Sequence, residues 1–63
     1  MFKFEVNEVV KYIKTDEELV IVNRLKDRMN NTYFCRDKNN KIDAYSENDL
    51  TGQIDIEAYS QPN

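Results

Sequence analysis

The 63-residue chain contains no histidine and no tryptophan, and it has one cysteine, one glycine and one proline. Histidine is the commonest general base near neutral pH, so its absence removes most acid–base catalysis. One cysteine excludes an internal disulfide and a multi-cysteine zinc site, and one glycine excludes a glycine-rich phosphate loop. Asp43, Glu47 and Asp49 lack the spacing of a calcium loop and are interpreted as solvated acids. We expect a protein that is not an enzyme and that holds no cofactor or metal.

Long apolar runs are also missing, because no stretch approaches the ~20 residues that a membrane-spanning helix needs. Residues 1–5 lack the basic segment and apolar stretch of a signal peptide, so we expect a cytoplasmic protein without membrane segments. Hydrophobic residues make up 40% of the chain and charged residues 33%, which is typical of a soluble globular protein. We expect one domain over residues 1–57 and a flexible tail at 58–63.

The net charge of −3 is unevenly distributed along the chain. Residues 1–23 carry three lysines and five acids, and residues 24–41 carry six basic residues and two acids. Residues 42–63 carry five acids and no basic residue. Such a distribution either places a basic region beside an acidic flank or reflects random clustering on a solvated surface.

Apolar and polar residues alternate from Phe2 to Val6, a pattern that is typical of a half-buried strand or arm. The polar residues that follow predict a turn at 6–8. Two valines and a second apolar pair then predict the first main strand at residues 9–14, and the next polar residues predict a turn at 15–17.

The stretch 18–25 allows two interpretations. Three consecutive β-branched residues, Val20-Ile21-Val22, favour a strand. However, Thr15 and Glu18 match a helix capping box. Apolar residues at helical spacing would continue such a helix: Leu19, Val22, Leu25 and Met29. We predict the strand, followed by a polar loop at 26–31, and keep an α+β fold with a helix at 16–29 as the alternative.

Residues 32–45 predict a β-hairpin. Asn39-Asn40 is the expected turn because asparagine tolerates positive φ. Tyr33 and Cys35 share one face of the first strand, and Phe34 lies on the other face. Because both faces carry apolar groups, we expect the hairpin to be central in a sheet that curls on itself, with Cys35 as a small core residue.

The segment after the hairpin is expected to form a single 3-10 turn and a closing strand. Ser46 can cap the turn, and Leu50 is expected to enter the core. Gly52 is expected to take a positive φ in a bend. Residues 53–57 alternate and predict the last strand, whose exposed edge would allow weak pairing between two copies. Its two acids oppose such pairing, so we expect a monomer or a weak homodimer.

The opening Phe4-Glu5-Val6-Asn7-Glu8-Val9-Val10 resembles the Phe-x-Val-Gly-Asp-x-Val opening of small SH3-like and KOW-like bacterial barrels. The apolar strand, the hairpin and the turn that ends in Leu50 follow in the matching order, through residue 57. Asn7 stands where glycine is usual, and asparagine is the best substitute where φ is positive. The resemblance implies an all-β, strongly bent barrel of five strands with one 3-10 turn before the last strand. Members of this family bind peptides, nucleic acids or other proteins, so the function stays open.

Nucleic-acid binding is one of two functions that the sequence leaves open. A basic groove with tyrosines that stack on bases would suit a single strand. The candidate residues lie over 24–41 and beside it: Arg24, Lys26, Arg28, Arg36, Lys38 and Lys41, with Tyr12, Tyr33 and Tyr45. A pI near 4.8 argues against a dedicated nucleic-acid binder, and the tyrosines could instead be core rings whose hydroxyls reach water.

Protein binding is the function that we predict, because a barrel too small to enclose a ligand acts through its surface. Exposed tyrosine and arginine anchor many interfaces, so Tyr12, Tyr33, Tyr45 and Arg36 are candidate contacts, and Met29 could add a soft one. The acidic last third of the chain could also bind a basic partner. In size, charge and composition the chain resembles small accessory proteins of phages and mobile elements.

Overall fold

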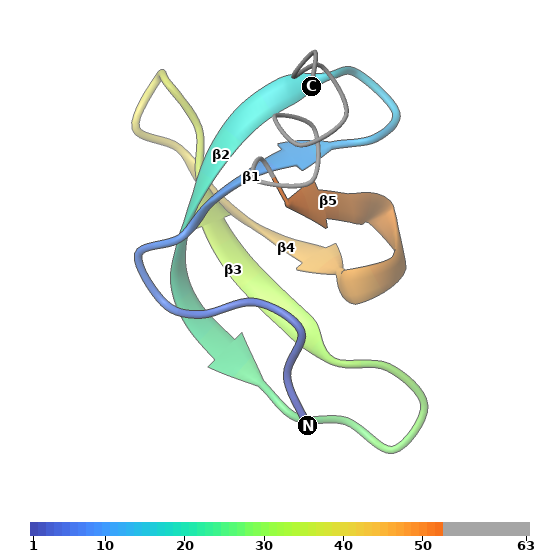
Figure 1. Cartoon of the computed structure of the whole chain (residues 1–63). Coiled ribbons are helices and arrows are strands. Elements are labelled where there is room, and N and C mark those ends of the chain that lie inside the picture. Colours follow the sequence, from blue (N-terminus) through green and yellow to red (C-terminus); the bar gives the residue numbers. More distant parts are fainter. Residues whose placement is uncertain (53–63) are drawn as a thin grey trace, which may run out of the picture.

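The computed structural model describes residues 1–52, which form one five-stranded antiparallel sheet and one 3-10 turn (Figure 1). The elements in chain order are β1 (Val9–Tyr12), β2 (Glu17–Leu25), β3 (Thr32–Arg36), β4 (Ile42–Ser46), the 3-10 turn η1 (Glu47–Asp49) and β5 (Leu50–Gly52). The strand order is β4-β3-β2-β1-β5. The prediction of an all-β fold is confirmed. This part of the chain contains no helix with the length and apolar character that a membrane crossing requires.

Strand β2 covers the stretch that the sequence left open between strand and helix. Leu19 and Ile21 are fully buried, whereas Val20 and Val22 on the other face are half-buried. This period of two belongs to a strand, and β2 pairs with β1 on one side and β3 on the other. The helix alternative at 16–29 is therefore wrong, because burial of β-branched residues on both faces outweighs the capping signal.

A β-bulge in β2 changes which side chains face the core. The register shifts between Ile21 and Asn23, so Asn23 pairs with Phe34 and Arg24 pairs with the buried Tyr33. Paired residues share a face of the sheet, and the extra residue therefore places Arg24 on the core side, where an unbroken alternation would put Asn23.

Among the described residues three have a positive φ, and all are asparagine or aspartate: Asn7 (77°), Asp16 (66°) and Asn40 (69°). These residue types tolerate the left-handed region, which a tight turn demands. Asn7 and Asn40 fulfil the prediction for their turns. In the β3–β4 turn the Asp37 carboxylate adds order, because its Oδ1 accepts hydrogen bonds from the backbone N–H groups of Asn39 (2.8 Å) and Lys41 (2.9 Å).

The connection from β4 to β5 agrees with the prediction except at its end. Ser46 caps η1, its hydroxyl accepting a hydrogen bond from the N–H of Asn48, and Leu50 is 2% exposed. Gly52 does not have a positive φ, so that prediction is wrong. Leu50 begins β5, and Gly52 pairs with Val10 in extended conformation. The strand predicted at 53–57 and the tail at 58–63 lie outside the described residues.

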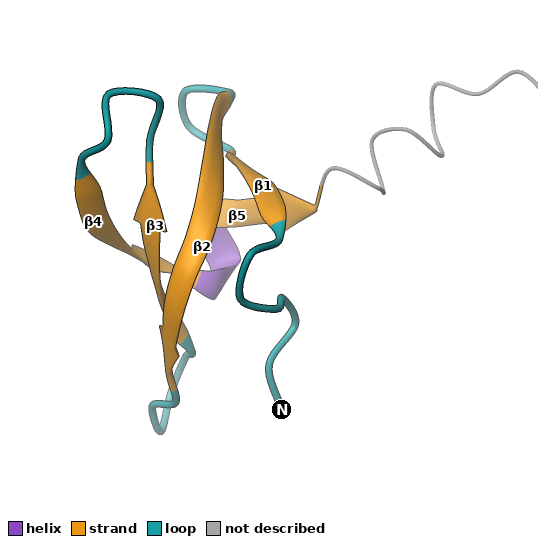
Figure 2. Ribbon diagram, turned by 90° about the vertical axis from the view of Figure 1, so that its left-hand side faces the viewer, coloured by secondary structure: helices purple, strands orange, loops and turns teal. Residues whose placement is uncertain are grey.

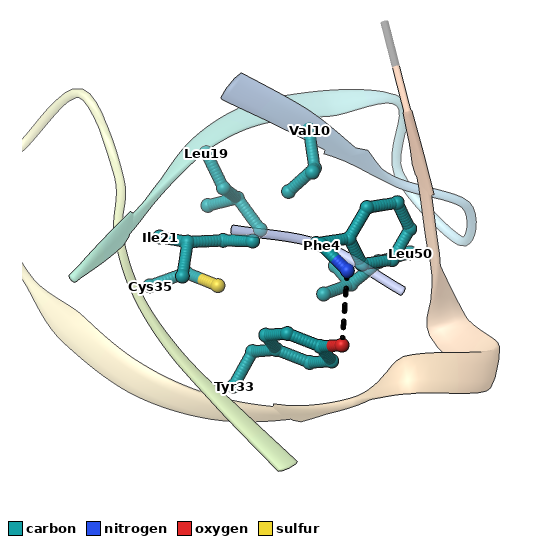
Figure 3. Close-up of a cluster of buried hydrophobic side chains, with 7 residues drawn as sticks. All are labelled: Phe4, Val10, Leu19, Ile21, Tyr33, Cys35 and Leu50. Carbon is teal, nitrogen blue, oxygen red and sulfur yellow. Dashed lines mark hydrogen bonds between the residues drawn. The ribbon is translucent and has the colours of Figure 1, made fainter. Parts of the chain in front are cut away.

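The sheet curves around its core but is not closed within residues 1–52 (Figure 3). The curvature brings Tyr12 of β1 against Tyr45 of β4, with ring centroids 5.0 Å apart, although β2 and β3 lie between these strands in the sheet. A closed barrel remains a prediction. The hairpin is not central as a whole, because β3 is interior whereas β4 ends the strand order and exposes residues 42–44.

Within residues 1–52 the core contains seven buried hydrophobic residues, which come from every strand except β4 and from the N-terminal segment (Figure 3). They are Phe4, Val10, Leu19, Ile21, Tyr33, Cys35 and Leu50. Tyr33 and Cys35 are both completely buried, whereas Phe34 is half-buried, so the predicted faces of β3 are confirmed. Cys35 is the small core residue that its position among aromatic residues indicated.

Residues 1–5, the N-terminal arm, pack on this core without forming a strand. Phe4 is 2% exposed, and its ring meets Tyr33 edge-on at 5.4 Å. Phe2 makes a similar contact with Tyr33 at 6.0 Å. The Arg24 guanidinium lies 4.4 Å from the Phe2 ring, and its Nη1 donates to the carbonyl of Phe4 (3.2 Å). The arm therefore contributes core residues although it has no ladder of its own.

Three polar side chains, Tyr33, Glu47 and Asn31, fasten the arm, and we call them the polar clamp. The Tyr33 hydroxyl accepts hydrogen bonds from the N–H groups of Lys3 (3.0 Å) and Phe4 (3.2 Å) and donates to Glu47 Oε2. The same Oε2 accepts from Lys3 N (2.9 Å) and Asn31 Nδ2 (3.1 Å). One carboxylate thus connects the arm, β3 and η1.

The clamp shifts the pKa values of its two ionisable members in opposite directions. The hydrogen bond from Tyr33 lowers the pKa of Glu47, and those from Lys3 N and Asn31 act in the same sense. Burial, followed by the hydrogen bond to Glu47, raises the pKa of Tyr33. Both shifts favour a carboxylate that accepts from a neutral phenol.

We predict that Tyr33→Phe destabilises the protein by ~1–3 kcal/mol, because it leaves the buried N–H group of Phe4 without its acceptor and removes one of the three hydrogen bonds to the Glu47 carboxylate. Tyr12→Phe is the control, since the Tyr12 hydroxyl forms no hydrogen bond within the described residues. Urea unfolding followed by circular dichroism measures both. Equal stability of the two variants would show that the clamp contributes little.

We predict that Glu47 also makes stability depend on pH. A carboxyl group whose pKa falls on folding stabilises the native state above its unfolded pKa, and this contribution is lost as the pH falls through the lowered folded value. The ordinary value is 4.5. The stability difference between the wild type and Glu47→Gln should therefore be constant near neutral pH and shrink below about pH 4.5. Urea midpoints measured from pH 7 to 3 test this, and a difference that grows on acidification would contradict it.

Candidate functional site

A groove of about 680 Å³ lies between the β1–β2 turn and the β3–β4 turn, and we call it the turn groove. Both turns lie at the same end of the sheet, opposite the 26–31 loop (Figure 2). The groove is lined by apolar, acidic and basic side chains: Val9, Thr15, Asp16, Glu17, Glu18, Val20, Arg36, Asp37 and Lys38.

Strand pairing positions the floor of the turn groove. Val9 pairs with Val20, and Val20 pairs with Arg36, so these three residues form a row across β1, β2 and β3. Residues in one row of a sheet share a face, and here it is the face away from the core. Val9 and Val20 are half-buried, whereas Arg36 is exposed. The floor therefore consists of two valine side chains and is bounded by the guanidinium of Arg36.

The β1–β2 turn supplies an acidic wall of Asp16, Glu17 and Glu18. The N–H of Asp16 donates to the carbonyl of Tyr12 (2.7 Å), which closes the turn. Glu17 Oε1 accepts from the Thr15 hydroxyl (3.3 Å). The Asp16 carboxylate pairs with Lys11 at 3.6 Å but stays 82% exposed, and so exposed a pair is weak. The carboxylate of Asp16 is therefore accessible to a ligand.

The β3–β4 turn supplies the opposite, basic wall. Arg36 and Lys38 are exposed, and within residues 1–52 their side chains form no ion pair. The two backbone hydrogen bonds to Asp37 fix the turn that carries them. Lys41 belongs to the same turn and pairs weakly with Asp43 at 3.9 Å. Two cations thus face the groove on a well-defined backbone.

The basic residues predicted to form one groove lie at two ends of the sheet. Arg36, Lys38 and Lys41 belong to the end with the turns. Lys26 and Arg28 lie in the opposite loop, together with Met29. Arg24 lies four residues along β2 from Val20, the residue that pairs with Arg36. At the rise per residue of a β-strand, this separation is roughly 13 Å. The Arg24 guanidinium is engaged with the N-terminal arm and with Glu5 at 3.3 Å.

The three candidate tyrosines have different environments. Tyr33 has no exposed surface, so it does not form part of a binding surface, and the reason is its role in the core and in the polar clamp. Tyr12 and Tyr45 are half-buried and pack against each other and the core. Neither lines the turn groove. Tyr33 is a core ring, as one interpretation of the sequence expected, but its hydroxyl does not reach water because the polar clamp holds it.

The sequence interpretation missed several residues of the turn groove and of the polar clamp. Asp16 and Glu17 were assigned only to a polar turn, and nothing local indicates that they line the same groove as Arg36. Val20 was assigned only to a strand, and its half-buried side chain forms part of the groove floor. Glu47 is not a solvated acid, because it is half-buried and accepts three hydrogen bonds.

Residues 1–52 contain no cluster of metal-ligating side chains, and their one thiol is buried. Within residues 1–52, no three His, Cys, Asp or Glu side chains gather as metal ligands. Burial raises the pKa of the Cys35 thiol to about 11, so the thiolate is scarce at neutral pH.

Comparisons with protein-family models, with curated proteins and with solved structures found no match to this chain. The resemblance to SH3-like and KOW-like barrels accordingly rests on the sequence pattern alone.

We predict that Cys35 reacts with a thiol reagent such as dithionitrobenzoate more than ~100-fold more slowly in the native protein than in denaturant. The thiol is fully buried, so the reagent reaches it only through unfolding. Absorbance of the released thionitrobenzoate measures the rate. Equal rates with and without denaturant would contradict the burial of Cys35.

Proposed function

We propose that the protein is a non-enzymatic binding module that holds an extended segment of a partner protein in the turn groove. The observation that carries this proposal is the charge separation across the groove. Asp16 and Glu17 stand on one side, Arg36 and Lys38 on the other, and the valine floor lies between them. A segment with an acid, a central apolar residue and a base would match all three features in one orientation.

The size and openness of the groove agree with a peptide ligand of modest affinity. Its volume of about 680 Å³ lies within the ~300–1,000 Å³ of ordinary ligand sites. Exposed ion pairs contribute only ~0.2–1 kcal/mol each, and the apolar floor consists of two valine side chains. We therefore expect a dissociation constant on the order of micromolar or weaker.

Nucleic acid fits the same groove less well. A phosphate backbone that bound Arg36 and Lys38 would also meet the acidic wall, and the net charge of the chain is −3. The other basic residues, Lys26 and Arg28, lie at the far end of the sheet and cannot extend the contact. The resemblance to small SH3-like barrels, whose members include peptide binders, supports the protein reading.

We predict that an ampholytic peptide binds more tightly than peptides of a single charge sign. Three ten-residue peptides with the same central valine pair would be compared: one with acids at one end and bases at the other, one with acids at both ends, and one with bases at both ends. The first peptide should shift the amide signals of the labelled protein around Val9, Val20 and Arg36. The other two peptides should bind at least ~5-fold more weakly.

Charge reversal at the groove provides the matched control. The double variant Arg36→Glu/Lys38→Glu should lose the ampholytic peptide, whereas Lys26→Glu/Arg28→Glu has the same charge change at the other end and should keep it. Loss in both variants would indicate a net-charge effect. The absence of shifts with every peptide would overturn the proposed groove.

A further inference from the structure

The loop 26–31, together with Leu25, forms a second exposed surface at the end of the sheet opposite the turn groove (Figure 2). Met29 is 88% exposed and Leu25 is 55% exposed. Lys26 and Arg28 lie between them in the sequence and are also exposed. We call these four residues the methionine surface.

The backbone beneath the methionine surface is anchored at both sides of the loop. Leu25 pairs with Thr32, which closes the connection between β2 and β3. Asn31 is only 9% exposed, and its Nδ2 donates to the carbonyl of Met1 (2.8 Å) and to Glu47. Asn30 Oδ1 accepts from Asn48 Nδ2 (3.1 Å). The exposed side chains therefore project from a loop whose ends are fixed to the fold.

The charges of the loop favour a partner of negative charge. Lys26 and Arg28 carry two positive charges, and Asp27 carries one negative charge. Within residues 1–52 the side chains of Lys26 and Arg28 form no ion pair. The Asp27 carboxylate turns back to its own backbone, where Oδ1 accepts from the N–H of Arg28 (2.6 Å). The whole chain has a net charge of −3, so an acidic partner is attracted only to its basic regions, which are this loop and the basic wall of the turn groove.

We propose that the methionine surface binds an acidic segment of a partner protein that carries an apolar side chain. The flexible thioether of Met29 can adapt to such a side chain, and Leu25 extends the apolar contact. Lys26 and Arg28 would pair with carboxylates on either side of it. This surface is independent of the turn groove, and because the two lie at opposite ends, occupation of one leaves the other open.

Two other ligand classes match these features less well. Single-stranded nucleic acid is bound largely through exposed aromatic rings, and the loop has none. The nearest ring on the arm, Phe2, is half-buried beneath the Arg24 guanidinium. A membrane surface is bound by a broad apolar face, whereas this loop presents two apolar side chains.

The experiment titrates the labelled full chain with four probes and follows its amide shifts. The first is a ten-residue peptide with a Leu-Phe pair between two pairs of acids, and the second replaces Leu-Phe by Ser-Ser. The third is a ten-nucleotide single-stranded DNA, and the fourth is vesicles containing phosphatidylserine. We expect the first peptide to shift the amides of residues 25–31 and to bind at least ~5-fold more tightly than the serine peptide.

Single substitutions separate the apolar and the charged contributions. Met29→Ser and Arg28→Glu should each weaken the first peptide about fivefold or more, because each removes one class of contact. Lys14→Glu lowers the net charge equally with Arg28→Glu. Lys14 is exposed and belongs neither to the turn groove nor to the methionine surface, so this variant should change the affinity less than ~2-fold. The amide spectra of the free variants confirm that each is folded.

Three results would overturn the proposal. Equal binding of the leucine–phenylalanine and serine peptides would reduce the contact to charge alone. Tighter binding of DNA or vesicles than of the first peptide would assign the surface to a different class of partner. Shifts that map to the turn groove instead of residues 25–31 would show that the acidic peptide recognises Arg36 and Lys38.

Discussion

The hydroxyl of Tyr33 and the carboxylate of Glu47 meet at the point where three distant parts of the chain converge. Through them, the N-terminal arm is tied to β3 and to η1, and two aromatic side chains of the arm are held over the core. A sheet this small has little apolar surface to bury, so the ring of Phe4 is a substantial part of its core. The clamp places that ring without a strand ladder, by satisfying backbone N–H groups with side-chain oxygens.

This arrangement leaves the two ends of the sheet free for recognition. The turn groove depends on positive φ at Asp16 and Asn40 and on the Asp37 hydrogen bonds, and none of these belongs to the clamp. Asn31 belongs to the clamp and also anchors the end of the loop that carries the methionine surface. Under the two proposals, binding at that end would be coupled to how firmly the arm is held, whereas binding at the turn groove would depend on local turn geometry.

The sequence predicted most of the fold, because its signals there are local. Period-two patterns, asparagines at positive φ and the Ser46 cap each act over a few residues, and all were recognised. The β-bulge in β2 was not, since it depends on pairing with β3. The same bulge turns Arg24 toward the arm. The basic residues of 24–41 do not form one surface, because the others lie at two opposite ends of the sheet. The charged walls of the turn groove and the role of Glu47 depend on contacts between residues far apart in sequence, which no local pattern records.

Amide hydrogen exchange at Lys3 and Phe4 tests most directly whether the arm is a part of the core. Both N–H groups donate to the Tyr33 hydroxyl, so they should exchange nearly as slowly as the amides of β2 and should be exposed only by global unfolding. In Glu47→Gln their protection should fall more than that of β2. Exchange of both amides at the rate of an unstructured peptide in the wild type would contradict the clamp and, with it, the account of how this chain completes its core.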